Sequence, residues 1–205
     1  MLAISTATKK AYIALKVGEI IDYREIDANC KQSENILKEI DFLLEKNNLK
    51  LQDVGNFGVV VGPGSFTGLR IGVALVKGLC AGQKNHRVVP ISMLDLMAWQ
   101  YKADANPDGK FTCIINALSG RLFVATYDKN CKKLSDEKMI LETELPQMEG
   151  DKVFLKEEFA GVLGGISITP ETLLNLALKN EEKQTVSAFD VCPVYIRKSQ
   201  AEENA

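Results

Sequence analysis

A run of valines that leads directly into a glycine-rich turn constrains the fold of this chain more than any other segment. Val59, Val60 and Val61 are β-branched and favour a buried strand. Residues 62–72 then read Gly-Pro-Gly-Ser-Phe-Thr-Gly-Leu-Arg-Ile-Gly. The first two glycines permit backbone angles that other residues avoid, and the proline between them fixes φ, so the chain has to turn sharply. We therefore expect a strand, a tight turn and the start of a helix in immediate succession.

The layout of this turn is similar to that of a phosphate-binding loop, but the sequence lacks the residue that such a loop requires. Ser65 or Thr67 can accept a hydrogen bond from the first free N–H groups of the helix. The nucleotide-binding pattern G-x-x-x-x-G-K-[ST] places a lysine after its last glycine, whereas Leu69 and Arg70 follow Gly68. The pattern therefore does not predict a phosphate loop at this position.

Hydrophobic periodicity predicts strands and helices along the whole chain. We expect strands at residues 2–6, 11–16, 19–27, 59–61, 88–91, 111–116, 122–128, 139–141 and 153–155. We expect helices at residues 33–47, 66–82 and 170–179, the last capped by Thr169, and a further helix capped by Ser92. The first half thus reads βββαβαβα, and the second half looks like a degraded copy of it. This pattern alone predicts an α/β fold with mixed sheets.

A polar segment at residues 103–110 interrupts the apolar pattern, with Asn-Pro-Asp-Gly at residues 106–109. It predicts a boundary between an N-terminal lobe, residues 1–105, and a smaller C-terminal lobe, residues 106–205. The N-terminal lobe carries the glycine-rich segment and the first two predicted helices.

The segment at residues 62–72 resembles the signature of the TsaB (YeaZ) family, which is an uninterrupted string of eleven residues. Weaker matches lie at Gln32-Ser33-Glu34 and at residues 193–197. The resemblance implies the actin-like ATPase (ASKHA) fold, in which two lobes of βββαβα type follow each other and the second is degenerate here. The residues that correspond to the family's motif loop are Gly62, Pro63, Gly64, Ser65, Phe66, Thr67, Gly68 and Arg70.

Composition and charge exclude several functional classes. The 205 residues carry a formal net charge of −2 and a sequence pI of about 5.6, so no global basic field draws the chain onto nucleic acid. No apolar run approaches the roughly 20 residues that cross a bilayer, and the N-terminus lacks the pattern of a signal peptide. The five cysteines are scattered without a C-x-x-C pair, which favours reduced thiols in a cytoplasmic protein. We expect only indirect contact with tRNA and no contact with a membrane.

The positions at which the resemblance would place catalytic carboxylates hold neutral residues. Enzymes of the actin-like fold usually carry an aspartate at the end of the first strand, where it serves Mg²⁺ and phosphate, and Ser5 stands there in this chain. A second position that is often acidic in the family is Asn116. The hydroxyls of Ser5, Thr6 and Thr8 can contact phosphate, although polar turn residues are the simpler interpretation.

The remaining candidates do not complete an active site. His86 is the only histidine, so the H-x-x-x-H metal site known for TsaD cannot form, and no nucleophile elbow accompanies it. The segment at residues 161–165 is either an adenosine-binding turn or an ordinary glycine-rich loop. We therefore predict no catalytic residue, no metal ligand and no cofactor.

The helix at residues 66–82 offers a surface instead. Its apolar arc covers about 200°, whereas a helix that packs on one layer needs a stripe of about 100°. Gly68 and Gly72 are four residues apart and would let another helix approach closely. The alternative is that this helix is buried between the sheet and a neighbouring helix of the same subunit.

The helix at residues 33–47 adds a candidate anchor to this surface. Phe42 lies on the side opposite the apolar stripe, and aromatic residues dominate the energetics of interfaces. The stripe itself consists of Ile36, Leu37, Ile40, Leu43 and Leu44. The predicted partner interface consists of Phe42, Gly68, Leu69, Ile71, Gly72, Val73, Leu75, Val76 and Leu79.

The resemblance implies a function that this surface would serve. TsaB-like proteins pair with the catalytic subunit TsaD through their first two helices and form homodimers when TsaD is absent. With the ATPase TsaE, the complex forms N6-threonylcarbamoyladenosine at position 37 of ANN-reading tRNAs. We thus expect a non-catalytic scaffold subunit. The alternative is an independent nucleotide-dependent enzyme of the actin-like fold, such as a small kinase or ATPase.

Overall fold

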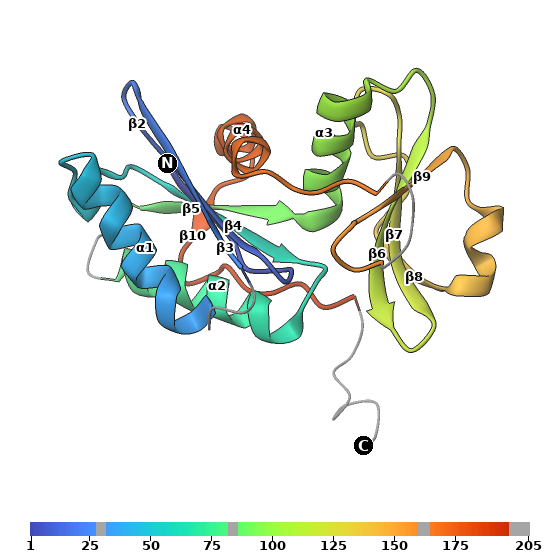
Figure 1. Cartoon of the computed structure of the whole chain (residues 1–205), viewed down its shortest axis with the longest axis horizontal. Coiled ribbons are helices and arrows are strands. Elements are labelled where there is room, and N and C mark those ends of the chain that lie inside the picture. Colours follow the sequence, from blue (N-terminus) through green and yellow to red (C-terminus); the bar gives the residue numbers. More distant parts are fainter. Residues whose placement is uncertain (28–31, 82–85, 160–164, 197–205) are drawn as a thin grey trace.

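The chain folds into two β-sheets with helices packed against both faces of the first (Figure 1). The computed structural model describes residues 1–27, 32–81, 86–159 and 165–196. The strands of the first sheet are β1 (Leu2–Ser5), β2 (Ala11–Val17), β3 (Ile20–Ile26), β4 (Phe57–Gly62), β5 (Arg87–Ser92) and β10 (Val186–Ser187). The strands of the second sheet are β6 (Phe111–Leu118), β7 (Arg121–Tyr127), β8 (Lys138–Leu141) and β9 (Asp151–Phe154). The helices are α1 (Gln32–Lys46), α2 (Phe66–Cys80), α3 (Met93–Ala105) and α4 (Pro170–Glu181), with 3₁₀ turns at Leu51–Asp53 and Glu142–Gln147.

The two sheets repeat one topology. The first sheet has the order β10-β5-β4-β1-β2-β3, with β1 antiparallel to β2, β2 antiparallel to β3, and β1 parallel to β4. The second has the order β8-β7-β6-β9, with the same directions for β6, β7, β8 and β9. Where α1 connects β3 to β4 in the first lobe, only the 3₁₀ turn at Glu142–Gln147 lies between β8 and β9. The second lobe is thus the degenerate copy that the pattern predicts.

Side chains on the two faces of the first sheet pack into different cores, because successive residues of a strand point to opposite sides. Leu2 and Ile4 of β1 point to the face covered by α1 and α2, whereas Ala3 points to the face covered by α3 and α4. The core on this second face continues without a break to Phe111 and Tyr127 of the second sheet. A shared core therefore joins the two lobes.

The last described part of the chain returns to the first sheet. Helix α4 packs on β1, β2 and β5, and β10 pairs with β5. The backbone N–H of Val194 donates to the carbonyl oxygen of Val61 at 2.8 Å. The expected C-terminal lobe, residues 106–205, is therefore not one unit in space, since only its first part builds the second sheet.

Local signals set the ends of the helices. The Ser65 hydroxyl accepts from the N–H of Gly68 at 3.2 Å, so Ser65 rather than Thr67 caps α2. Ser92 caps α3 and Thr169 caps α4, as the sequence predicts. Helix α2 ends at Cys80, two residues before the predicted end, and residue 82 lies outside the described residues.

Two glycines of the motif bring α2 unusually close to the chain segment that follows β1. A Cβ atom at Gly68 would lie far inside the contact distance of the Thr6 carbonyl oxygen, and one at Gly72 would lie 2.5 Å from the Thr6 hydroxyl oxygen. That hydroxyl donates to the carbonyl oxygen of Gly68 at 2.6 Å. These glycines therefore make room for Thr6 of the same subunit. Their spacing had instead suggested room for a partner helix.

Replacing Gly68 by alanine should destabilise the fold. The new methyl group would have to displace backbone atoms of Thr6, and overpacking of this kind costs about 1–3 kcal/mol. Gly78 of the same helix is the matched control, because a Cβ there meets nothing within 4 Å and alanine improves helix propensity by up to about 1 kcal/mol. Urea unfolding should show a loss of stability for Gly68→Ala and none for Gly78→Ala. Equal unfolding midpoints would contradict the packing described here.

Candidate functional site

A cleft of about 720 Å³ lies between the lobes, where the repeated topology brings equivalent elements together. Residues 7–9 of the β1–β2 turn line it, together with residues 116–119, which form the end of β6 and the start of the β6–β7 turn. These two turns occupy the same position in the repeated topology. The motif loop and the first turn of α2 complete the lining, together with Phe123 and Glu158.

The motif loop is held at the edge of this cleft by contacts on both sides. Gly62 and Gly64 have positive φ angles of 142° and 159°, which other residues rarely adopt, and the peptide bond between Gly62 and Pro63 is cis. The N–H of Ser65 donates to the carbonyl oxygen of Ala7 at 2.8 Å. Phe66 stacks on Tyr195 with ring centroids 4.7 Å apart. The loop thus connects β4, the β1–β2 turn and the C-terminal segment.

Two of the three hydroxyl groups that the sequence suggested as phosphate contacts form hydrogen bonds within the subunit instead. Thr6 donates to the carbonyl oxygen of Gly68 and Thr8 donates to that of Lys10 at 2.9 Å. Ser5 is fully buried, and its hydroxyl oxygen has no hydrogen-bond partner among the residues that the structure describes. Ser5 does not line the cleft, so the position of the expected carboxylate presents no polar group to it.

The side chain of Asn116, at the second expected carboxylate position, bonds the backbone of its own turn. Its side-chain oxygen accepts from the N–H of Leu118 at 2.8 Å. Leu118 and Ser119 both have positive φ, 64° and 54°, so this bond supports a strained turn. Asn116 also donates its backbone N–H to the Glu158 carboxylate at 2.9 Å. The side chain therefore stabilises the turn that borders the cleft.

Glu158 is the carboxyl group of the cleft that the sequence did not single out. Burial raises its pKa to about 7, although the hydrogen bond from Asn116 favours the charged form. The preceding Glu157 accepts a hydrogen bond from the Tyr12 hydroxyl at 2.8 Å and so connects the lobes. No periodic or motif signal marks either residue, because their surroundings exist only after the two lobes have come together.

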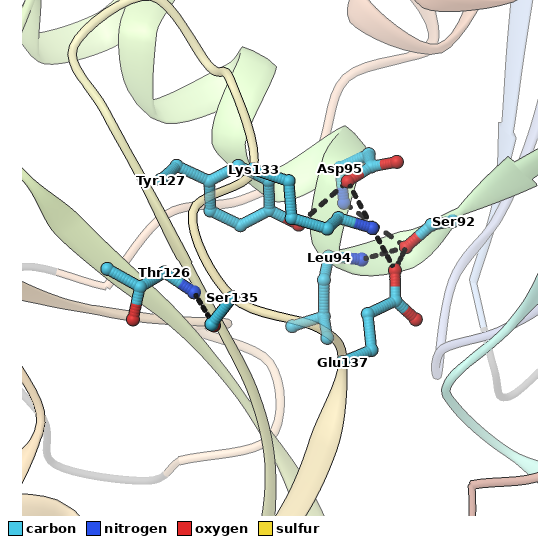
Figure 2. A network of polar contacts seen from close by, with 8 residues as sticks. All are labelled: Ser92, Leu94, Asp95, Thr126, Tyr127, Lys133, Ser135 and Glu137. Atoms are coloured by element: carbon cyan, nitrogen blue, oxygen red, sulfur yellow. Dashed lines mark hydrogen bonds and ion pairs between the residues drawn. The ribbon is translucent and has the colours of Figure 1, made fainter.

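A polar cluster on the other side of the shared core fixes the lobes relative to each other (Figure 2). Asp95, in the first turn of α3, accepts from the Tyr127 hydroxyl at 2.8 Å and pairs with the Lys133 ammonium at 2.9 Å. The same ammonium pairs with Glu137 at 2.6 Å, and Glu137 accepts from the Ser92 hydroxyl at 2.5 Å. We call these five residues the interlobe cluster.

The charges within the interlobe cluster stabilise one another. Burial alone would lower the pKa of the Lys133 ammonium, but its hydrogen bonds to Glu137 and Asp95 outweigh this effect and raise the pKa overall. Half-buried ion pairs that share one cation are screened less than exposed pairs. The cluster therefore ties the start of α3 to the second sheet.

Other candidate groups remain apart. The ring of His86 packs on Phe57 with centroids 5.2 Å apart, and its Nδ1 has no hydrogen-bond partner in the described part of the chain. Within residues 1–27, 32–81, 86–159 and 165–196, no three histidine, cysteine, aspartate or glutamate side chains gather as a metal site. Four residues of the glycine-rich segment 161–165, all except Gly165, lie outside the described residues. Among the described helices, none is long and apolar enough to cross a membrane.

The predicted partner interface divides into buried and exposed residues. Ile71, Leu75 and Leu79 are half-buried along one side of α2, and Phe42 is 50% exposed. The other residues pack against the subunit's own sheet, so their assignment to the surface is corrected, because β1 and β4 cover that part of the apolar arc. The buried residues are Gly68, Leu69, Gly72, Val73 and Val76.

The exposed side of α2 has its own pair of small residues. Ala74 and Gly78 are four residues apart and exposed, and Ile71 and Leu75 lie next to them. Helix α2 carries no acidic residue. We call Ile71, Ala74, Leu75 and Gly78 the α2 face.

Helix α1 exposes Leu37 in addition to Phe42. The Arg24 guanidinium lies 4.5 Å from the centroid of the Phe42 ring and also pairs with Glu39 at 3.3 Å. Since Arg24 belongs to the edge strand β3, this side of α1 faces the edge of the sheet. Leu37, about 140° away from Phe42 around the helix, is 47% exposed. Leu37 was expected in the buried stripe, which is therefore narrower than predicted.

Comparisons with known proteins identify the class. The family model described as "TsaD: tRNA N6-adenosine threonylcarbamoyltransferase" matches residues 27–145. The solved structure of YeaZ from Pseudomonas aeruginosa superposes with a TM-score of 0.78 over 95% of this chain and 98% of that chain, at 20% identity. A second Pseudomonas aeruginosa structure, described as similar to peptidase YEAZ, gives a TM-score of 0.79 over 96% of this chain and 98% of that chain, at 20% identity. The chain is thus a protein of the actin-like fold, and the predicted fold class is confirmed.

Two curated relatives place the chain within this class. It is 27% identical to the tRNA threonylcarbamoyladenosine biosynthesis protein TsaB of Haemophilus influenzae over 222 aligned positions, which cover 96% of this chain and 93% of that protein. It is 25% identical to TsaB of Bacillus subtilis over 227 positions, which cover 98% of this chain and 96% of that protein. The chain belongs to the TsaB (YeaZ) family of tRNA threonylcarbamoyladenosine biosynthesis, as its motif predicts.

Replacing Glu158 by glutamine should change how stability depends on pH. The folded state holds the Glu158 proton more tightly than the unfolded state, whose pKa is 4.5, so the stabilisation is complete below pH 4.5 and is lost as the pH rises through about 7. Glutamine is neutral throughout and can still accept from the Asn116 N–H. We expect Glu158→Gln to be more stable than the wild type at pH 8, with a difference that shrinks toward pH 4.5.

Thermal unfolding at a series of pH values measures this difference. The exposed Glu182 provides the control, and Glu182→Gln should follow the wild-type pH dependence. Parallel curves for the wild type and Glu158→Gln would show that the carboxyl group keeps an ordinary pKa.

Proposed function

We propose that this chain is a non-catalytic subunit that binds and supports a TsaD-like catalytic subunit. Together with a TsaE-like ATPase, the assembly forms N6-threonylcarbamoyladenosine at position 37 of ANN-reading tRNAs. The observation that carries the proposal is the α2 face. Its exposed small residues, Ala74 and Gly78, lie beside the half-buried side chains of Ile71 and Leu75, on a helix without acidic residues. The assembly would act in the cytoplasm, and tRNA would contact this subunit only indirectly.

The α2 face has the properties of a helix-packing surface. Small residues at positions four apart let a second helix come near, and the apolar side chains beside them gain free energy when water is excluded. Leu37 extends this surface toward α1, and Phe42 forms its outer margin above Arg24. The same surface can pair with a second copy of the chain when the catalytic partner is absent.

The cleft supports the non-catalytic part of the proposal. The residues at the two expected carboxylate positions, Ser5 and Asn116, offer no acidic group, and Glu158 is held by the backbone of Asn116. The shared core and the interlobe cluster hold the two sides of the cleft together. A nucleotide-dependent enzyme would need a metal-binding carboxylate and a hinge at this place.

An independent nucleotide-dependent enzyme is the other candidate, and the size of the cleft is the observation in its favour. The two candidates differ in a simple assay. The purified chain, free of TsaD-like and TsaE-like proteins, should not hydrolyse ATP above the rate of a buffer control. Steady hydrolysis that is lost on replacing Lys9 would favour the enzyme.

Gly78→Gln should weaken association with the TsaD-like subunit while leaving the free subunit folded. The position is open to solvent, and glutamine is a good helix former, so the free subunit should be at least as stable as the wild type. In the complex the long side chain would hold the partner helix away from α2. We expect the dissociation constant for the TsaD-like subunit of the same organism to rise at least about tenfold, which corresponds to about 1.4 kcal/mol.

The matched control is Gly78→Ala, which adds one methyl group at the same site and should bind more tightly than Gly78→Gln. Calorimetric titration measures both affinities, and sedimentation velocity measures self-association. Wild-type affinity of a folded Gly78→Gln variant for both partners would exclude the α2 face as the interface.

A further inference from the structure

We infer that the turn at residues 187–190, with Phe189 at its tip, forms a second contact for the partner that binds the α2 face. This inference rests on the proposed function, because it assumes that a partner helix lies on α2. It assigns the anchoring residue to a segment more than 100 residues away from α2 in the sequence.

Phe189 is the most exposed large apolar side chain in the described part of the chain, at 88%. Among the described residues, the ring belongs to none of the three apolar cores and has no ring contact with another aromatic residue. The side chain is therefore not required to fill an apolar core. Aromatic side chains, phenylalanine among them, are in contrast enriched in protein interfaces.

The turn presents this ring in a fixed position. Ala188 and Val191, on either side of it, are buried in the core between the first sheet and its helices α1 and α2. The N–H groups of Asp190 and Val191 donate to the carbonyl oxygen of Ser187 at 3.0 and 3.2 Å, and the N–H of Phe189 donates to the Ser187 hydroxyl at 3.3 Å. A preorganised anchor loses little conformational entropy when a partner covers it.

The turn is attached to α2 itself. The Lys77 ammonium donates to the carbonyl oxygen of Phe189 at 3.2 Å. Lys77 lies on the flank of α2 opposite Leu75, about 160° away around the helix axis. The small residues Ala74 and Gly78 therefore lie between a margin formed by Leu75 and a margin formed by the Phe189 turn. A helix bound over the small residues would touch both margins.

The chemistry of the surface defines the partner segment. Arg70 and Lys77 are the only charged residues of α2, and both are cations. Beside Phe189 lies a hollow of about 220 Å³ that Lys77 and His86 line, and His86 Nδ1 lacks a hydrogen-bond partner within the described residues. These features fit an amphipathic helix of the catalytic subunit with an apolar face for Phe189 and an acidic side chain near Lys77.

The test compares Phe189→Ser with Leu134→Ser in the full-length chain. Leu134 is also an exposed apolar residue, at 46%, but it precedes β8 of the second sheet. Both variants should keep the wild-type melting temperature, because neither side chain is buried. We expect Phe189→Ser to weaken binding to the TsaD-like subunit about tenfold or more, and Leu134→Ser to change it less than about twofold. Phe189→Leu should restore part of the affinity.

The outcomes separate this inference from the proposed function. If Phe189→Ser binds like the wild type while Gly78→Gln binds more weakly, the Phe189 turn is not part of the interface and the proposed function stands. If neither variant weakens binding, both proposals fail. Should Phe189→Ser fail to fold, Phe189→Leu and Phe189→Asn decide instead. If both variants fold like the wild type and bind the TsaD-like subunit with undiminished affinity, the inference is overturned.

Discussion

The close packing of α2 on Thr6 is the constraint on which the rest of the structure depends. Glycine at positions 68 and 72 lets the helix approach until the Thr6 hydroxyl bonds the Gly68 carbonyl oxygen. This contact sets the rotation of α2 about its axis. It turns Leu69, Val73 and Val76 into the core and leaves the opposite side of the helix, with Ala74 and Gly78, in solvent. The family motif thus determines which side of α2 is exposed, because its glycines fix how the opposite side packs.

The cleft between the lobes has kept its shape but not the chemistry expected of it. Its equivalent turns face each other as the repeated topology requires, yet their polar groups bond the neighbouring backbone. The shared core and the interlobe cluster join the lobes on the side of α3 (Figure 2). A body whose lobes are joined in this way, and whose cleft lacks the two expected carboxylates, is suited to present a surface.

Local sequence signals predicted the elements that local forces form. The valine strand, the motif turn and the caps Ser92 and Thr169 depend on neighbouring residues and occur where the sequence places them. The rotation of α2 could not be predicted, because Gly68 with Gly72 and Ala74 with Gly78 have the same spacing of small residues. Only a contact with Thr6, 62 residues away, distinguishes them. Glu158 and Lys133 escaped notice for a similar reason, since Glu158 accepts from Asn116, 42 residues away, and Lys133 pairs with Asp95 of the other lobe.

Formation of N6-threonylcarbamoyladenosine in a reconstituted mixture tests the central claim, that this chain acts through its surface and not through its cleft. The mixture contains tRNA, the TsaD-like and TsaE-like proteins and this chain as wild type, as Gly78→Gln or as Lys9→Ala, which alters the lining of the cleft. Mass spectrometry of the tRNA nucleosides measures the product. The account predicts that Lys9→Ala supports modification like the wild type and that Gly78→Gln does not. Full support by Gly78→Gln together with loss of support by Lys9→Ala would contradict it.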